Sequence, residues 1–331
     1  MPLDNLTTNE TFLTEYPFRT ESKLFFNTYS EPLVGKYKDG NTDQIGIWRD
    51  DETNSFLGNH TEKYEIVNNQ PLIKGIEAQI IKSVSNSLFT LGTRTISNVL
   101  DNVEVNDFMS FNGKVCIAEY KFNKLAESVG TLNPSDVLFR LIILNSFDGS
   151  KPITVYGGTI DTFCTNGLIT GQFTTTSQRH TGDFNDKGHK KIKNGIENMF
   201  KNYSKELERY HRWAKTPLND NVVNDFLTNQ FVKSEIVKEV NDGIERDVIH
   251  ETVGMNKRKD LFNIWESERD RRGANLWALT SALTYYSSSG DYGTRSSDND
   301  HEHATRLKQQ NEMSNVLNSR EFIKLEQRIA A

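Results

Sequence analysis

Residues 108–122 read FMSFNGKVCIAEYKF, and this stretch decides the fold class. Asn112 and Gly113 separate two runs of strand-forming residues, and Asn-Gly in that position is the strongest local signal of a β-hairpin with a two-residue turn. After the turn, alternate positions are apolar or small, which predicts one buried face of a strand. The residues on that face are Cys116, Ala118, Tyr120 and Phe122.

The strand pattern continues downstream to about residue 164. Residues 137–144 form an apolar run interrupted only by Arg140, and Asp148-Gly149 can supply the positive φ that returns the chain into 153–164. Helical periods follow in the C-terminal half. The expected fold class is therefore α+β, an antiparallel β-sheet meander covered by C-terminal helices.

Helical spacing predicts two amphipathic helices. The first follows a short strand at 64–69 and starts near Pro71. Its apolar positions are Leu72, Ile73, Ile76, Ile80, Val84 and Leu88. The second helix ends before Pro217. Its apolar positions are Ile192, Ile196, Met199, Tyr203, Leu207, Tyr210 and Trp213.

The rest of the C-terminal half is also expected to be helical, over 218–249, around 274–286 and from 306 to 331. The core candidates in 218–249 are Val222, Val223, Phe226, Phe231, Ile236 and Val240. This organisation predicts three regions. Residues 1–60 form an irregular N-terminal lobe or arm, 61–185 a mixed helix and antiparallel-sheet core, and 186–331 a mainly helical region with a flexible loop near 287–300.

Composition excludes several classes of protein. The chain has 331 residues and a net charge of −6, so it is not a polybasic nucleic-acid binder over its whole surface. The N-terminus lacks a signal peptide and no apolar stretch is long enough to span a membrane, which predicts a soluble cytoplasmic protein without a membrane partner. Its two cysteines, Cys116 and Cys164, lie in apolar runs and suit buried reduced thiols rather than a disulfide framework or a paired-cysteine metal site.

One segment has a positive net charge, although the chain as a whole is negative. Residues 179–215 hold ten basic and five acidic side chains. The start of the predicted helix gathers a group that we call the basic cluster, where free backbone N–H groups also favour phosphate. The basic cluster consists of Arg179, His180, Lys187, Lys190, Lys191 and Lys193. It indicates a nucleic-acid backbone contact, and the alternative is the solvated face of an amphipathic helix balanced by acidic residues elsewhere.

Other combinations of residues are weaker candidates for chemistry. Cys164, Asn166 and His180 have the residue types of a cysteine-nucleophile site, but a core thiol and a turn explain them as well. A polar loop contains residue types that bind metals, His301-Glu302-His303 with Asp298 and Asp300. A pair of carboxylates for metal-assisted hydrolysis could be imagined at Asp136 and Asp148, although Asp148 suits a turn. We therefore assign no catalytic residue, no metal site and no cofactor.

Exposed aromatic rings could stack on nucleic-acid bases. Trp277, Tyr285 and Tyr286 are the candidates, and Trp277 is expected to pack in the core.

Four blocks of sequence, in this order, resemble a family of phage- and plasmid-encoded proteins known as domain of unknown function nine-thirty-two. They are residues 64–69, 136–166 with Leu144-Asn145-Ser146-Phe147-Asp148-Gly149-Ser150 at their centre, 179–182, and 275–286. The resemblance covers about residues 64–317. It implies a phage or plasmid origin and an intracellular location in a bacterial host, and it implies no reaction and no catalytic residue.

These observations favour a non-enzymatic protein that binds single-stranded nucleic acid as an accessory of phage or plasmid DNA replication or recombination. The alternative is a structural or interaction protein that assembles with itself or with another phage protein. An enzyme is disfavoured because the sequence contains no complete catalytic constellation.

Overall fold

A computed structural model describes residues 18–34, 41–87, 95–130, 132–161, 170–181, 187–241, 244–289, 312 and 314–327. At its centre is a five-stranded antiparallel sheet whose strands follow one another in chain order. The strands are β4 (Val103–Met109), β5 (Val115–Val129), β6 (Ser135–Ser146), β7 (Ile153–Asp161) and β8 (Thr170–Gln178). The predicted meander is confirmed, and the fold class is α+β.

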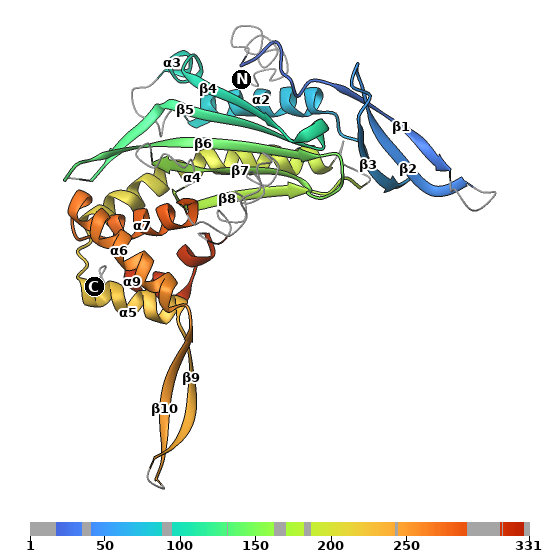
Figure 1. The fold of residues 1–331 in the computed structure, drawn as a ribbon. Helices are drawn as coiled ribbons and strands as arrows, with labels where there is room; N and C mark the ends of the chain where they lie inside the picture. The colour runs from blue at the N-terminus through green and yellow to red at the C-terminus, as the bar shows by residue number, and fades with distance from the viewer. Residues whose placement is uncertain are drawn as a thin grey trace.

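Two long helices pack on one face of this sheet (Figure 1). They are α2 (Asn69–Ser87) and α4 (His189–Lys215), and the short α3 (Ile96–Leu100) precedes β4. The apolar period of α4 points its residues into the core as predicted, with Leu207 only partly buried. The predicted strand face also lies in this core, because Cys116, Ala118, Tyr120 and Phe122 are all buried.

The hairpin between β4 and β5 exists, but the predicted two-residue turn is wrong. The backbone amide of Ser110 donates to the Val115 carbonyl, so four residues separate this pair. Asn112 (φ 65°) and Gly113 (φ 84°) do supply positive φ inside the loop. The Ser110 hydroxyl accepts a bond from the Val115 amide, which stabilises the longer loop.

The expectation of an irregular lobe over residues 1–60 is also wrong for the part that the structure describes. Three antiparallel strands form a second sheet beside the first (Figure 1). They are β1 (Asn27–Val34), β2 (Asn41–Asp50) and β3 (Phe56–Thr61). Ile47 and Leu57 on one face of this sheet are fully buried, so a period of two was present but was obscured by the many polar residues. The predicted strand at 64–69 is reduced to one bridge between Tyr64 and Thr181.

A second cluster of helices lies at the other end of the molecule (Figure 1). It contains α5 (Asp220–Phe231), α6 (Met255–Arg272), α7 (Leu276–Ser289) and α9 (Arg320–Gln327). The helix predicted over 218–249 is wrong beyond Phe231, because β9 (Lys233–Asn241) and β10 (Ile244–Val253) form an antiparallel hairpin there. Asp242-Gly243 between two short segments that contain several Ile and Val residues is a hairpin signal that the helical interpretation missed.

The described residues agree with the composition on two further points. Cys116 is a buried free thiol, and burial raises its pKa to about 12. Cys164 and most of the expected loop at 287–300 lie outside the described residues. Within the described helices, none has an apolar stretch that could cross a lipid bilayer.

Candidate nucleic-acid interface

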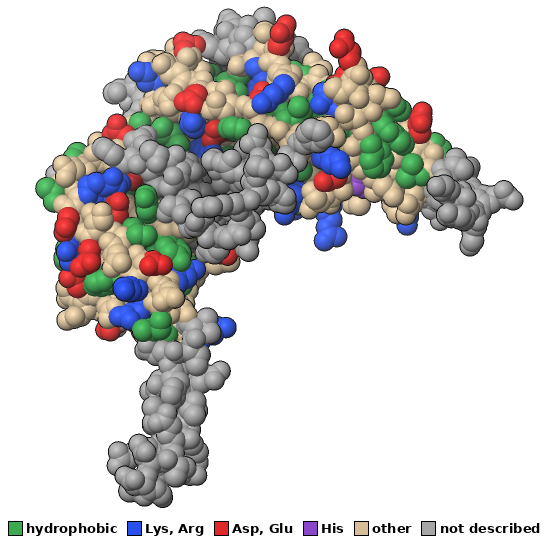
Figure 2. All heavy atoms as spheres, viewed as in Figure 1, with side chains coloured by type: hydrophobic (Ala, Val, Ile, Leu, Met, Phe, Trp, Pro, Cys, Tyr) green, Lys and Arg blue, Asp and Glu red, His purple; other side chains and the backbone are tan. Residues whose placement is uncertain are grey.

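The basic cluster lies where the chain leaves the last strand of the five-stranded sheet, β8, and enters α4. Arg179 follows the end of β8, Lys187 precedes α4, and Lys190, Lys191 and Lys193 occupy its first two turns. All five of these side chains are exposed. Blue Lys and Arg atoms protrude from the underside of the sheet region in Figure 2, close to a purple His. The structure therefore brings five of the six predicted residues to one exposed region.

Most of these cations have no acidic partner among the residues that the structure describes. Within the described part of the chain, Arg179, Lys190, Lys191 and Lys193 form no ion pair. Farther along α4, Lys201 pairs with Glu197 at 2.6 Å and Arg209 binds Glu326 at 2.7 Å, whereas Lys205, Arg212 and Lys215 also form no ion pair within the described residues. Five of the ten basic residues of 179–215 therefore lie between Arg179 and Lys193, and the other five lie along the rest of α4.

His180 has a different role from the rest of the basic cluster. It is buried, and its Nδ1 lies 3.3 Å from the Glu65 carbonyl oxygen, to which the neutral ring can donate. Burial lowers the pKa of His180 to about 4, so the ring is uncharged at neutral pH. His180 therefore adds no positive charge to the surface.

Three aromatic rings form a parallel stack that fixes this end of the sheet. His60 lies 3.7 Å from Tyr64, centroid to centroid, and Tyr64 lies 4.8 Å from His180. The Tyr64 hydroxyl donates to the Ser146 carbonyl, and His60 Nε2 lies 2.8 Å from the Phe147 carbonyl oxygen. The stack joins β3, the loop after β6 and the end of β8, so Arg179 is presented from a rigid base.

Three of the four blocks that carry the family resemblance meet at this stack. Asn145 of the second block donates to the Val67 carbonyl at 2.9 Å and to the Asn69 side chain at 2.8 Å, both in the first block. The amide of Glu65 donates to the carbonyl of His180 in the third block. Blocks far apart in the sequence therefore build one structural unit beside the exposed cations.

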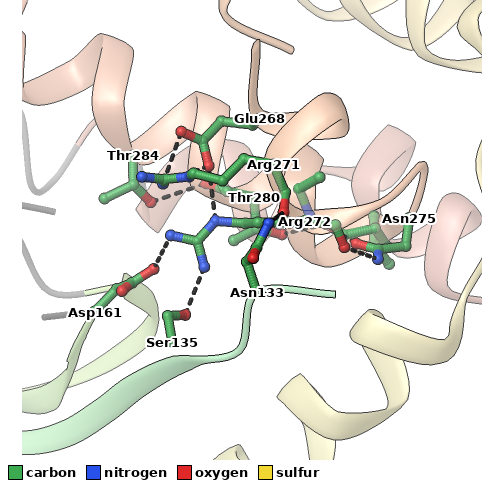
Figure 3. Close-up of polar contacts among 11 residues, drawn as sticks. Asn133, Ser135, Asp161, Glu268, Arg271, Arg272, Asn275, Thr280 and Thr284 are labelled. Atoms are coloured by element: carbon green, nitrogen blue, oxygen red, sulfur yellow. Dashed lines mark hydrogen bonds and ion pairs between the residues drawn. The ribbon is translucent and has the colours of Figure 1, made fainter. Parts of the chain in front are cut away.

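The fourth block lies at the opposite end of the sheet, around Arg272 (Figure 3). Arg272 is buried and donates to Asp161 at 2.6 Å, to Glu268 at 2.7 Å and to the Ser135 hydroxyl. Asn275 begins the block, donating to the Arg272 carbonyl and accepting from the amide of Ala278. This charged centre ties strands β6 and β7 to helices α6 and α7, and nothing in its sequence distinguished Arg272 from a solvated arginine.

The other candidates do not assemble into a site within the described residues. Asp136 accepts from Ser128, while Asp148 accepts from the Ser146 hydroxyl and from the amide of Ser150, which is a turn role. Among the described residues, no group of three or more His, Cys, Asp or Glu side chains could hold a metal ion. Cys164, Asn166 and the segment 298–303 lie outside the described residues.

The aromatic candidates separate clearly. Trp277 is buried, as expected, whereas Tyr285 is 44% exposed. The ammonium group of Lys257 lies 5.5 Å from the centroid of the Tyr286 ring, which is partly buried.

Comparison with known proteins gives a family without a known activity. No curated protein and no solved structure matches the chain. The family described as "Domain of unknown function (DUF932)" matches residues 92–311, more than half of the chain. This range contains the second, third and fourth blocks, and the first block precedes it. The chain therefore belongs to the DUF932 family.

Proposed function

We propose that this protein binds single-stranded nucleic acid without catalysing a reaction, through the five exposed members of the basic cluster. The observation that carries the proposal is the group of exposed cations that form no ion pair with any described residue, Arg179, Lys190, Lys191 and Lys193, in a chain with a net charge of −6. Unpaired cations on an otherwise acidic protein favour a phosphate ligand, because phosphate binding releases counterions.

The local backbone supports the same ligand. The first turn of α4 contains no acidic residue, and no side chain caps its N-terminus. The positive end of the helix dipole adds to the attraction of Lys190, Lys191 and Lys193 for an anion. Contacts of this kind go to the backbone of the nucleic acid, so binding should show little sequence preference.

The biological setting is part of the proposal. The family resemblance suggests an accessory role in phage or plasmid DNA replication or recombination, in the cytoplasm of a bacterial host. A mobile genetic element exposes single strands during both processes, and a protein that holds their backbone could serve either.

The test is a fluorescence-anisotropy titration with a labelled single-stranded oligonucleotide at several salt concentrations. Changing Lys190, Lys191 and Lys193 together to Gln should weaken binding about tenfold at low salt and lower the log–log salt slope by about 2, since each lost contact contributes about 0.7. The matched control changes Lys201, Lys205 and Lys215 to Gln, which removes the same charge from the same helix. Equal effects of both variants would contradict a localised site, and no binding by the unmodified protein at low salt would refute the function.

A second candidate function is assembly with another copy or with a protein partner, and the β9–β10 ribbon favours it. The ribbon projects from the helices in Figure 1, and among the described strands each of its two strands pairs only with the other. An isolated two-stranded hairpin is marginally stable in water, and open edges invite pairing. Light scattering of the full chain and of a variant with residues 234–252 replaced by a short Gly-Ser turn would test this, since only the full chain should self-associate.

A further inference from the structure

The outer face of the three-stranded sheet carries an aromatic surface that the basic cluster does not include. Tyr29 lies directly opposite Trp48 in the β1–β2 register, and Phe56 lies opposite Trp48 in the β2–β3 register. Phe56 is 42% exposed, and Tyr29 and Trp48 are half-buried. Hydrophobic side chains gather at the surface over β1–β3 in Figure 2.

The Tyr29 and Trp48 rings form a flat surface, which we call the platform, and the Phe56 ring stands at its edge. Tyr29 and Trp48 are nearly parallel, 16° apart with centroids separated by 5.9 Å, and Phe56 meets Trp48 edge-on at 5.2 Å. The indole lies against Gly46, where a Cβ atom would come within 2.1 Å of the ring. Gly46 thus leaves the room in which the Trp48 ring lies against the sheet.

Hydrogen-bonding groups border the platform. Asn59 is opposite Gly46 in the register, and its Nδ2 donates to Gln44 Oε1 at 2.9 Å. Both side chains are exposed, so the Asn59 carbonyl and the Gln44 amino group can still bond to an outside ligand. Flat rings beside amide groups suit a planar heterocycle that has polar edges.

We propose that Trp48, with Tyr29 and Phe56, stacks on unpaired bases of the nucleic acid whose phosphates bind the basic cluster. This inference rests on the proposed function and adds the reason for a preference for single strands, because bases inside a duplex do not present their faces. Cross-strand packing explains why the three rings adjoin. It does not explain why Phe56 stays exposed or why a glycine lies under the indole.

The two surfaces are connected through β3. Phe56 is the first residue of β3, and His60 in the same strand belongs to the ring stack that holds Tyr64 and His180 next to Arg179. The exposed side chains around the platform include Glu31, Asp50 and Glu52, which repel phosphate. The platform is therefore a base site and not a phosphate site, and its contribution should be independent of salt.

Tryptophan fluorescence tests this directly in the unmodified protein. Trp213, Trp265 and Trp277 are buried, so Trp48 is the one tryptophan of the four whose ring a ligand can reach. Titration with an oligothymidylate should quench emission as the base stacks, and Trp48→Phe should bind while showing no quenching. Unchanged emission at saturation, with anisotropy reporting binding, would overturn the platform and leave the proposed function standing.

Two variants complete the test. Trp48→Ala with Phe56→Ala should weaken single-strand binding at least about fivefold with an unchanged salt slope, since stacking carries no counterion release. Tyr285→Ala, which removes another exposed aromatic ring, is the matched control and should bind normally. If Tyr285→Ala weakens binding and the double change does not, the base site lies on α7 instead. If the unmodified protein binds no oligonucleotide at low salt, the proposed function and the platform fail together.

Discussion

Two groups of charged residues, at opposite ends of the five-stranded sheet, use positively charged side chains in opposite ways. At the start of α4, Lys190, Lys191 and Lys193 are exposed and form no ion pair within the described part of the chain. At the other end, Arg272 is buried and its guanidinium reaches Asp161 and Glu268. The first group is available to a ligand, whereas the second holds strands and helices together.

The difference shows that exposure and pairing determine what a charge does in this protein. Arg272 also lies 5.6 Å from the centroid of the buried Trp277 ring, and Arg271 donates to both oxygens of Glu268. Removing a member of such a centre leaves the remaining charges buried in a low dielectric without their partner. Removing an exposed lysine leaves no buried charge without a partner. The two groups should therefore respond to substitution in different measurements.

The largest effect is expected from Arg272→Met. The change removes the cation that Asp161 and Glu268 both contact, while Arg271 still donates to Glu268, and breaking a buried pair in this way costs about 3–5 kcal/mol. Urea unfolding followed by circular dichroism should show a correspondingly lower free energy of unfolding.

The matched control is Arg269→Met on the same helix. Arg269 pairs with Asp220, whose side chain is about half exposed, so its loss should cost far less than the loss of Arg272. Similar losses in both variants would mean that the Arg272 centre is no more important than a surface pair.

A smaller effect is expected from pH, through His180 beside the basic cluster. Its pKa falls from 6.5 to about 4 on folding because the ring is buried. The unfolded chain therefore binds the proton first as pH drops, and the stabilisation present above pH 6.5 is lost as pH falls through 4. This amounts to about 3 kcal/mol, measurable as a falling urea midpoint between pH 7 and pH 4. His189, whose pKa is also lowered by burial and by Lys193, acts in the same direction.

His180→Phe isolates this contribution, because it keeps a ring against Tyr64 and removes the titrating nitrogen. The variant should have a flatter pH dependence than the unmodified protein, and His211→Gln, which changes an exposed histidine, should not. An unaltered pH dependence in His180→Phe would assign the acid sensitivity to other groups.

The sequence predicted the elements whose period is long and uninterrupted. The apolar face of α4 and the alternation in β5 were correct because burial on one side leaves a regular trace. The three-stranded sheet was missed because Gly46 and polar residues interrupt its alternation, and β9 and β10 were missed because Ile and Val fit a short helical period as well as a strand. The Asn112-Gly113 hairpin was right in kind, but its loop length depends on the Ser110 hydroxyl.

The candidate site could be predicted only in part. Clustering in the sequence was enough to place the exposed lysines together, since helical neighbours stay close. It could not reveal that His180 is buried, which depends on stacking against Tyr64, more than a hundred residues away. The platform was equally hidden, because Tyr29, Trp48 and Phe56 meet only through strand register.

The smallest expected effect concerns the stability of the lysine variants. Three positive charges in the first two turns of α4 oppose the helix dipole, so changing Lys190, Lys191 and Lys193 to Gln should raise the free energy of unfolding slightly, by up to about 1 kcal/mol at low salt. Gln and Lys have similar helix propensities, and no described ion pair is lost.

The control triple at Lys201, Lys205 and Lys215 should shift stability slightly downward, because Lys215 lies at the favourable end of the dipole and Lys201 pairs with Glu197. Parallel urea titrations at low and high salt measure both changes, and salt should shrink each of them. A gain at the start of α4, with weaker oligonucleotide binding in the same variant, would mean that this surface retains unfavourable charge for the sake of its ligand. A clear loss would mean instead that these lysines stabilise the fold through contacts with other parts of the chain.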